Sequence, residues 1–319
     1  MVENYYLNRE FKEFEEYAES LRLWNIQIRK LQRGETLNIL KQLNLGDVHL
    51  SYGLFAGKTH QVGISPPERT FAFHDGKNSS IVWRNENVPS NGLMIFPNTC
   101  ELDIVTKGTQ NNVYTISIPD TSLFSEFEAR QRNINHKLGS TPELIHIPIH
   151  YVSRLKSLFR SCFRAIDDKP GLTTSAAFEQ DIREEILNTF SLALSTKESC
   201  STQPIGASKS NKWKKIEKIL KLSIDSPIKV HDLSQKSGVS ERTLRRLFHD
   251  RFGISPKTYL CRIRLNGVRH NLRKSTPFEV NVVDIANAWG FWHSGQFAAD
   301  YKQLFGELPS TTLKGSEII

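Results

Sequence analysis

The C-terminal third of the chain contains a short sequence pattern twice. The first copy reads LSQKSGV (residues 233–239) and the second reads IANAWGF (residues 285–291). In both copies a small residue, Ser234 or Ala286, stands four positions before a glycine. The small residue lets two helices cross closely, and the glycine can take the left-handed conformation that reverses the chain within a few residues. Each copy therefore predicts two helices joined by a tight turn, a helix-turn-helix unit.

The segment after the first copy predicts a helix with a strongly basic exposed side. Ser240 can accept a hydrogen bond from the backbone at the start of this helix, as N-cap residues do. Leucine and phenylalanine recur at helical spacing, so the remaining side is exposed and carries Arg242, Arg245 and Arg246. Arginine can bind a guanine through two hydrogen bonds in the major groove. These three side chains are therefore candidates for contacts with duplex DNA.

A long helix is expected between the two units, from Pro256 to Lys274. Its apolar positions fall on one side: Cys261, Leu265, Val268 and Leu272. A second side collects three arginines: Arg262, Arg269 and Arg273. A rigid connecting helix would hold the two units at a fixed separation, close to the ~34 Å between successive major-groove segments on one face of DNA.

The excess positive charge of the chain is confined to its C-terminal third. The 319 residues include 42 Lys and Arg against 34 Asp and Glu. Residues 209–319 hold 20 of the basic residues and 10 of the acidic ones, whereas residues 1–208 are nearly neutral. Such a division is expected for a polyanion-binding module joined to a neutral domain. The small, polar segment 198–211 predicts a flexible linker between domains at 1–197 and 212–314.

The first domain is expected to be a small antiparallel β structure. Between positions 37 and 118, short apolar runs alternate with turn residues. The runs are Val48–Leu50, Thr70–Phe73, Ile81–Trp83, Leu93–Phe96 and Val113–Ile118. Strands at this spacing favour a barrel or a sandwich, and helical patterns flank them. The predicted fold class is α+β, with an antiparallel β-barrel and flanking helices followed by an all-α domain.

Two longer segments resemble a known protein family. They read GVSERTLRRLF (residues 238–248) and GFWHSGQFAADYKQLFGELPS (residues 290–310). They closely resemble the DNA-binding domain of the AraC/XylS family of bacterial transcription regulators, and the ending GQFAADYKQLFGELP resembles the branch that contains ethanolamine-utilisation regulators. The resemblance covers about a third of the chain. It implies two helix-turn-helix units joined by a long helix, and a cupin-like sheet in the first domain.

The resemblance and the residue chemistry together assign roles to individual side chains. Base contacts are expected from Arg242, Arg245, Ser294 and Gln296. Backbone contacts are expected from Arg246, Arg262, Arg269, His293 and Lys302. Because the second unit offers no arginine on its recognition helix, we expect the first unit to supply most of the base discrimination.

The sequence carries no signature of an enzyme or of a metal site. Most histidines are dispersed: His49, His60, His74, His136, His146 and His150. Only His146 and His150 are close, and Pro148 between them disfavours a helix that would place both on one face. The four cysteines lack ligand or disulfide spacing. We therefore expect no metal, no cofactor and no catalytic residues. A cupin-type metalloenzyme with an attached DNA-binding domain remains an alternative.

The expected function is that of a DNA-binding transcription regulator. The family implies an activator that contacts RNA polymerase and is controlled by a small-molecule effector or by dimerisation through the first domain. A repressor or an architectural protein without an effector is the alternative. The apolar runs from Tyr52 to Phe73 and from Met94 to Pro97 could line an effector pocket or simply fill the domain, so no ligand-binding residues are named. Helices within 151–194 are expected to form a homodimer, and no apolar run predicts a membrane span, so the protein is expected in the cytoplasm.

Overall fold

The computed structural model describes residues 4–34, 36–76, 78–129, 138–196, 203–204, 211–222 and 228–315. The chain divides into two compact units. Unit 1 comprises Met1–Gln27, Leu37–Ala56 and Gln61–Gly206. Unit 2 comprises Ile28–Thr36, Gly57–His60 and Ala207–Ile319. Two short pieces from the first half of the chain therefore belong to the helical C-terminal unit.

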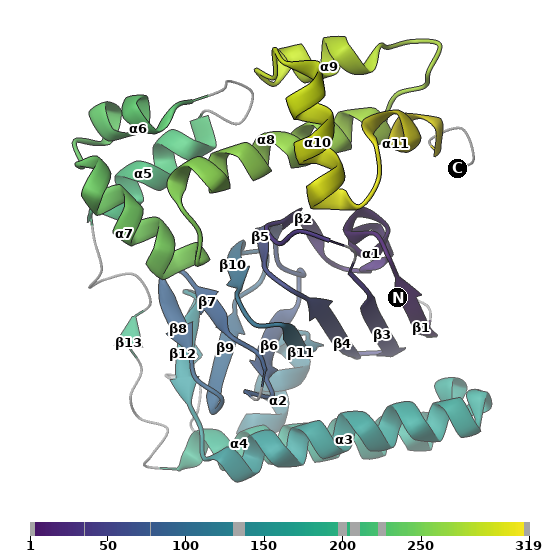
Figure 1. Ribbon diagram of the computed structural model, residues 1–319. Coiled ribbons are helices and arrows are strands. Elements are labelled where there is room, and N and C mark those ends of the chain that lie inside the picture. The colour runs from purple at the N-terminus through teal and green to yellow at the C-terminus, as the bar shows by residue number, and fades with distance from the viewer. Residues whose placement is uncertain are drawn as a thin grey trace. The chain divides into compact units, whose positions relative to one another are not determined.

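The strands are arranged in two sheets of antiparallel pairs (Figure 1). The larger sheet has the order β1 (Tyr5–Phe11), β3 (Asn38–Leu45), β4 (Val48–Ala56), β11 (Gln110–Ile118), β6 (Arg69–His74), β9 (Gly92–Phe96), β12 (Glu143–His146) and β13 (Gln203–Pro204). The smaller sheet has the order β2 (Asn25–Lys30), β5 (Thr59–Ile64), β10 (Glu101–Thr106), β7 (Ile81–Trp83) and β8 (Glu86–Val88). The α+β class is confirmed, and the strand pairing in the described residues gives two sheets without showing the closed barrel that we expected.

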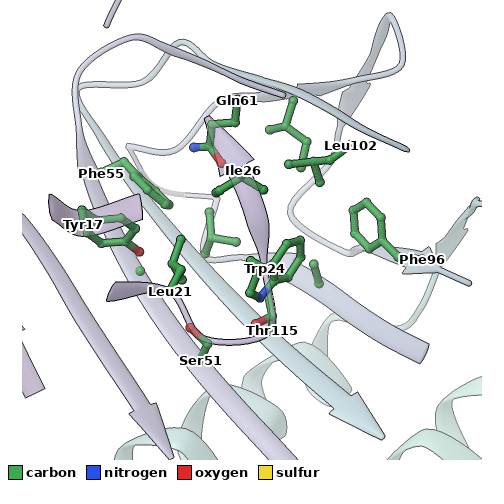
Figure 2. Close-up of a pocket in the computed structure, with 14 residues that line it drawn as sticks. Tyr17, Leu21, Trp24, Ile26, Ser51, Phe55, Gln61, Phe96, Leu102 and Thr115 are labelled. Atoms are coloured by element: carbon green, nitrogen blue, oxygen red, sulfur yellow. The ribbon is translucent and has the colours of Figure 1, made fainter. Parts of the chain in front are cut away.

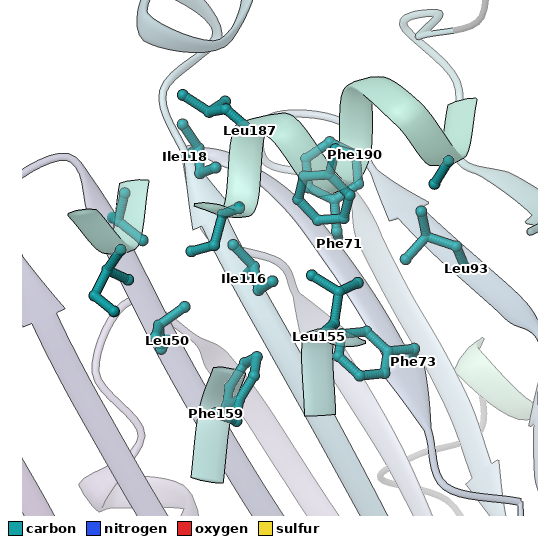
Figure 3. Packing of buried hydrophobic residues seen from close by; sticks show 14 of the residues in the cluster. Leu50, Phe71, Phe73, Leu93, Ile116, Ile118, Leu155, Phe159, Leu187 and Phe190 are labelled. Carbon is teal, nitrogen blue, oxygen red and sulfur yellow. The ribbon is translucent and has the colours of Figure 1, made fainter. Parts of the chain in front are cut away.

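The larger sheet is covered on both faces. One face packs against α3 (Ile149–Asp168) and α4 (Ala176–Ser195), where Phe71 and Phe190 lie with ring centroids 4.3 Å apart (Figure 3). The other face meets the smaller sheet in a second apolar cluster that includes Trp83 and Phe96. Because both faces are covered, β6 and β9 are buried at every position. Unit 1 also contains α1 (Phe14–Ser20), α2 (Asp120–Ala129) and a 3-10 helix (Pro170–Thr174).

Unit 2 contains the predicted helices of the two helix-turn-helix units and the predicted connecting helix, together with two further helices. They are α5 (Asn211–Leu222), α6 (Val230–Ser237), α7 (Glu241–Phe252), α8 (Pro256–Arg273), α9 (Val282–Ala288), α10 (Ser294–Phe305) and α11 (Pro309–Gly315). The connecting helix, predicted to end at Lys274, is α8, and Lys274 is its C-cap. The predicted linker 198–211 lies outside the described residues except for β13 and the first residue of α5.

Candidate nucleic-acid interface

The sequence repeat is also a repeat of backbone hydrogen bonds. In the first unit the Val239 amide donates to the carbonyl of Ser234 at 3.2 Å, and in the second the Phe291 amide donates to the carbonyl of Ala286 at 2.9 Å. The turn glycines, Gly238 and Gly290, have φ angles of +66° and +76°. The left-handed turns predicted for both units are confirmed, and each turn sets two helices at a close crossing.

The first recognition helix, α7, presents arginine on its exposed side. Its N-cap is Ser240, whose side chain accepts a hydrogen bond from the Thr243 amide at 3.4 Å, as predicted. Arg242, Arg245 and Arg246 are exposed. Arg245 lies 3.7 Å from Glu241, but this surface pair is too weak to hold the guanidinium in place. The three guanidinium groups can therefore reach a ligand.

Aromatic packing holds α7 in position from its opposite side. Phe248 and Phe252 are fully buried, and their rings contact the rings of Trp213 on α5 and Tyr259 on α8. Arg251 lies over the Trp213 ring at 4.8 Å. Because its buried side is fixed to two neighbouring helices, α7 offers its arginines from a rigid element.

The second recognition helix, α10, presents small and uncharged side chains at its start. His293 is the N-cap and makes no side-chain capping bond, and Ser294 is exposed beside it. The Gln296 amide group donates to Asp300 at 3.0 Å, so any contact with a base must compete with this bond. Lys302 is exposed further along the helix. All four predicted contact residues of this unit therefore lie at the surface.

Of the aromatic residues around the second turn, some pack in the core and one lies at the surface. Phe297 is buried, and Trp289 and Phe291 are partly buried against the same apolar cluster. Trp292, in contrast, is 72% exposed. The indole of Trp292 is therefore a surface feature next to the N-terminus of α10.

One predicted backbone contact on α8, that of Arg269, needs correction. Arg269 is 1% exposed, its guanidinium pairs with Glu307 at 2.6 Å, and it lies over the Phe305 ring at 4.7 Å. A side chain buried in this way cannot reach a DNA phosphate. Arg262 is half-buried and one of its guanidinium nitrogens donates to the carbonyl of Leu31, so its contact with a phosphate stays a prediction. Burial, and then nearby Arg33, lowers the pKa of Arg262.

The two short pieces that join unit 2 attach to α8. The Asn266 side chain accepts from the Lys30 amide at 2.8 Å and donates to the Lys30 carbonyl at 3.0 Å. The Tyr259 hydroxyl and the His60 ring are 2.9 Å apart. The sequence analysis did not predict these contacts. The only sign of them in the sequence is Asn266 itself, an asparagine on a helix with an apolar side, and it is buried in the structure.

The described residues provide no support for a metal or a membrane span. Among them, no three His, Cys, Asp or Glu side chains lie close enough to hold a metal ion. His146 ends β12 and His150 lies in α3, so they are on different elements, and His136 falls outside the described residues. No helix in the described part is long and apolar enough to cross a bilayer.

Comparison with known proteins relates this chain to transcription regulators. A model of a helix-turn-helix domain matches residues 233–315. The probable thc operon regulatory protein of Rhodococcus erythropolis is 36% identical over 103 residues, which are 30% of this chain and 31% of that protein. The XylDLEGF operon transcriptional activator of Pseudomonas putida is 32% identical over 102 residues, which are 32% of each. The chain thus spans about a third of the length of the curated relatives it matches.

A solved structure of another transcription regulator is also similar to this chain. It is that of a probable AraC family transcriptional regulator from Rhodopseudomonas palustris, which is 32% identical. The match covers 34% of this chain and 98% of that chain, with a TM-score of 0.30.

Proposed function

We propose that the chain is a helix-turn-helix transcription regulator of the AraC/XylS family, which its C-terminal third resembles, and that it binds specific duplex DNA sites and activates transcription from nearby promoters. The observation that carries this proposal is the pair of helix-turn-helix units in the basic third of the chain, with three exposed arginines on α7. The named relatives are regulators, and we take this chain to be a regulator and not an enzyme.

Each exposed side chain has a role in this proposal. Base edges are contacted by Arg242 and Arg245 from α7 and by Ser294 and Gln296 from α10. Phosphates are contacted by Arg246, His293 and Lys302. Arg262 keeps its proposed phosphate contact, because only one of its guanidinium nitrogens bonds Leu31, whereas Arg269 has no role on DNA, since its guanidinium is buried and paired with Glu307.

The remaining parts of the proposal concern unit 1 and the partners. We propose that its two sheets form a cupin-like effector domain, that its helices pair two copies into a homodimer, and that the DNA-bound protein contacts RNA polymerase in the cytoplasm. The ending GQFAADYKQLFGELP favours the branch with ethanolamine-utilisation regulators. A promoter carrying the bound site tests the direction of control, because an activator raises and a repressor lowers its transcription.

Selection of bound sequences from a random duplex library tests the proposed function. With the full chain we expect one enriched motif made of two blocks one helical turn apart. Binding should weaken steeply as salt rises, because basic side chains displace counterions from the phosphates. A library without an enriched motif would contradict sequence-specific binding.

Replacing Arg242 or Arg245 with alanine should weaken binding to the selected site by about 1–3 kcal/mol, because a two-point contact to a base is lost. Binding to random DNA should change much less. Lys314→Ala is the control, since Lys314 is an exposed cation on α11 outside both recognition helices. Equal losses on both DNAs would assign these arginines to phosphates instead.

The two recognition helices should contribute unequally to base discrimination. A scan of every base pair in the selected site should show losses of about 1–3 kcal/mol in one block and clearly smaller losses in the other. The reason is that α7 presents arginines, whereas Gln296 on α10 is already bonded to Asp300. Gln296→Ala should change only the weaker block. Two equally discriminating blocks would refute this division.

A further inference from the structure

Trp292, which stands two residues before α10, has a largely exposed indole. The chain contains five tryptophans, and all five lie in the described residues. The other four are buried or partly buried: Trp24, Trp83, Trp213 and Trp289. No hydrogen bond or ring contact joins the Trp292 side chain to another described residue. Because an indole in water forgoes the free energy of burying its apolar surface, a partner that covers Trp292 gains affinity.

The backbone is fixed on both sides of Trp292. The Phe291 ring before it lies 5.2 Å from the Phe297 ring, and the guanidinium of Arg264 lies 4.9 Å from the centre of the Phe291 ring. After it, the Phe297 amide donates to the carbonyl of His293 at 2.9 Å and closes the first turn of α10. Trp292 therefore projects from a rigid part of the second helix-turn-helix unit.

The first turn of α10, next to Trp292, is open to a phosphate. Ser294, Gly295 and Gln296 are exposed, and nothing lies within 4 Å of a Cβ added at Gly295. His293 makes no capping bond, and in the described residues no acceptor bonds the amides of these three residues. Free amides at the start of a helix attract phosphate. A phosphate bound there would hold the start of α10 at the major groove, as recognition helices are held.

The chemistry of the indole favours one feature of the major groove. The two faces of its ring carry no hydrogen-bonding group, and its single N–H can only donate. Thymine presents a methyl group in the major groove that the other three bases lack. The nearby Gln296 amide is less suited to discriminate between bases, since it already donates to Asp300 at 3.0 Å. An apolar contact between Trp292 and thymine is therefore the main base contact that this turn can offer.

We infer that the indole of Trp292 packs against a thymine methyl group in the major groove and gives the second unit a preference for thymine. The inference rests on the proposed function and adds a base-reading residue to it. The contact buries about one methyl group, so it should contribute about fourfold to the affinity for DNA. This effect is smaller than that expected for the arginines of α7, which agrees with the unequal roles of the two units.

Deoxyuridine in place of thymidine tests the contact, because it removes the methyl group and keeps the hydrogen bonds of the base pair. Each thymine of the selected site is replaced in turn, and binding of the full chain is measured. In the second block we expect a thymine whose replacement weakens binding by about fourfold. In the Trp292→Ala chain the same replacement should weaken binding by less than about twofold, because the two changes remove one contact.

The control is Phe278→Ala, since Phe278 is also an exposed aromatic residue of unit 2 but lies before α9. This variant should keep the full effect of the methyl group. The Trp292→Ala chain should unfold at the same urea concentration as the unchanged chain, since the indole is exposed.

Three outcomes would overturn the inference. A second block without a methyl effect means that no thymine is contacted there. Equal weakening of Trp292→Ala on the thymine site, on the deoxyuridine site and on random DNA would place the indole on the sugar-phosphate backbone. Unchanged DNA affinity of Trp292→Ala would assign the indole to a protein partner. Failure of the unchanged chain to select any DNA motif would instead contradict the proposed function.

Discussion

Arg269→Ala is expected to lower the free energy of unfolding by about 3 kcal/mol, the low end of the range for breaking a buried ion pair, because Glu307 is partly exposed. The guanidinium bonds Glu307 at 2.6 Å and also reaches Thr312 at 3.4 Å. Thr312 in turn lies 2.9 Å from the Tyr301 hydroxyl. Removal of Arg269 therefore leaves a carboxylate without its cation and opens a space beside Phe305, so that α8, α10 and α11 are all affected.

Urea unfolding of the full chain, followed by helical circular dichroism, measures this loss. Lys257→Ala is the control, because Lys257 is an exposed cation on the same helix and should change stability by less than about 0.5 kcal/mol. The salt dependence of DNA binding by the folded Arg269 variant should equal that of the unchanged chain. An unchanged stability together with a salt slope reduced by about 1 would show that Arg269 contacts a phosphate after all.

The burial of Arg269 could not be predicted from the residues near it in the sequence. Helical spacing correctly predicts α8, including its start at Pro256 and the burial of Leu265 and Leu272. The same spacing places Arg262 and Arg269 on a side without leucine, and exposure is the natural expectation there. That side is covered in the folded chain, since Glu307 and Thr312 come from a segment about forty residues further along. The spacing of apolar residues in a helix does not show which side of it a distant segment will cover.

The hydrogen bonds between Lys30 and Asn266 on α8 join residues that are even further apart in the sequence. Lys30 and Asn266 are separated by 236 positions, and only folding brings them together. The domain boundary expected near residue 200 follows from local composition, so it could not reveal that Ile28–Thr36 and Gly57–His60 join unit 2. The apolar runs correctly predicted β4, β6, β7, β9 and β11, whereas the other described strands and the order of the strands in two sheets were not predicted.

The features of the two recognition helices could be predicted from the sequence, because they depend on residues that lie close together in it. The turn glycines, the Ser240 cap and the exposed arginines all follow from residues within one helix-turn-helix unit. The apolar runs Tyr52–Phe73 and Met94–Pro97 supply part of the lining of a cavity in unit 1, including Phe55 and Phe96, but the rest comes from α1 and from other strands of the two sheets (Figure 2). Apolar runs that fill a domain and runs that line a cavity have the same composition.

Two glycines within helices of unit 2 should respond to alanine substitution with opposite signs. Gly267 lies in α8, and a Cβ added there would overlap the Trp289 ring. Trp289 packs against the apolar cluster of the second helix-turn-helix unit, so its indole cannot move without disturbing that cluster. Overpacking of this kind costs about 1–3 kcal/mol. Gly267→Ala should therefore destabilise unit 2, despite the better helix propensity of alanine.

Gly295 provides the matched comparison because it also lies inside a helix, the recognition helix α10, but nothing stands within 4 Å of an added Cβ. Gly295→Ala should stabilise the chain by about 0.5–1 kcal/mol through helix propensity alone. The two variants should thus differ by about 1.5–4 kcal/mol in urea unfolding of the full chain. Since Gly295 stands between Ser294 and Gln296, its alanine variant should also bind the selected DNA less tightly if this part of α10 enters the groove. A stabilised Gly267→Ala variant would mean that Trp289 is free to shift, and that the close approach of α8 to the second turn does not depend on this glycine.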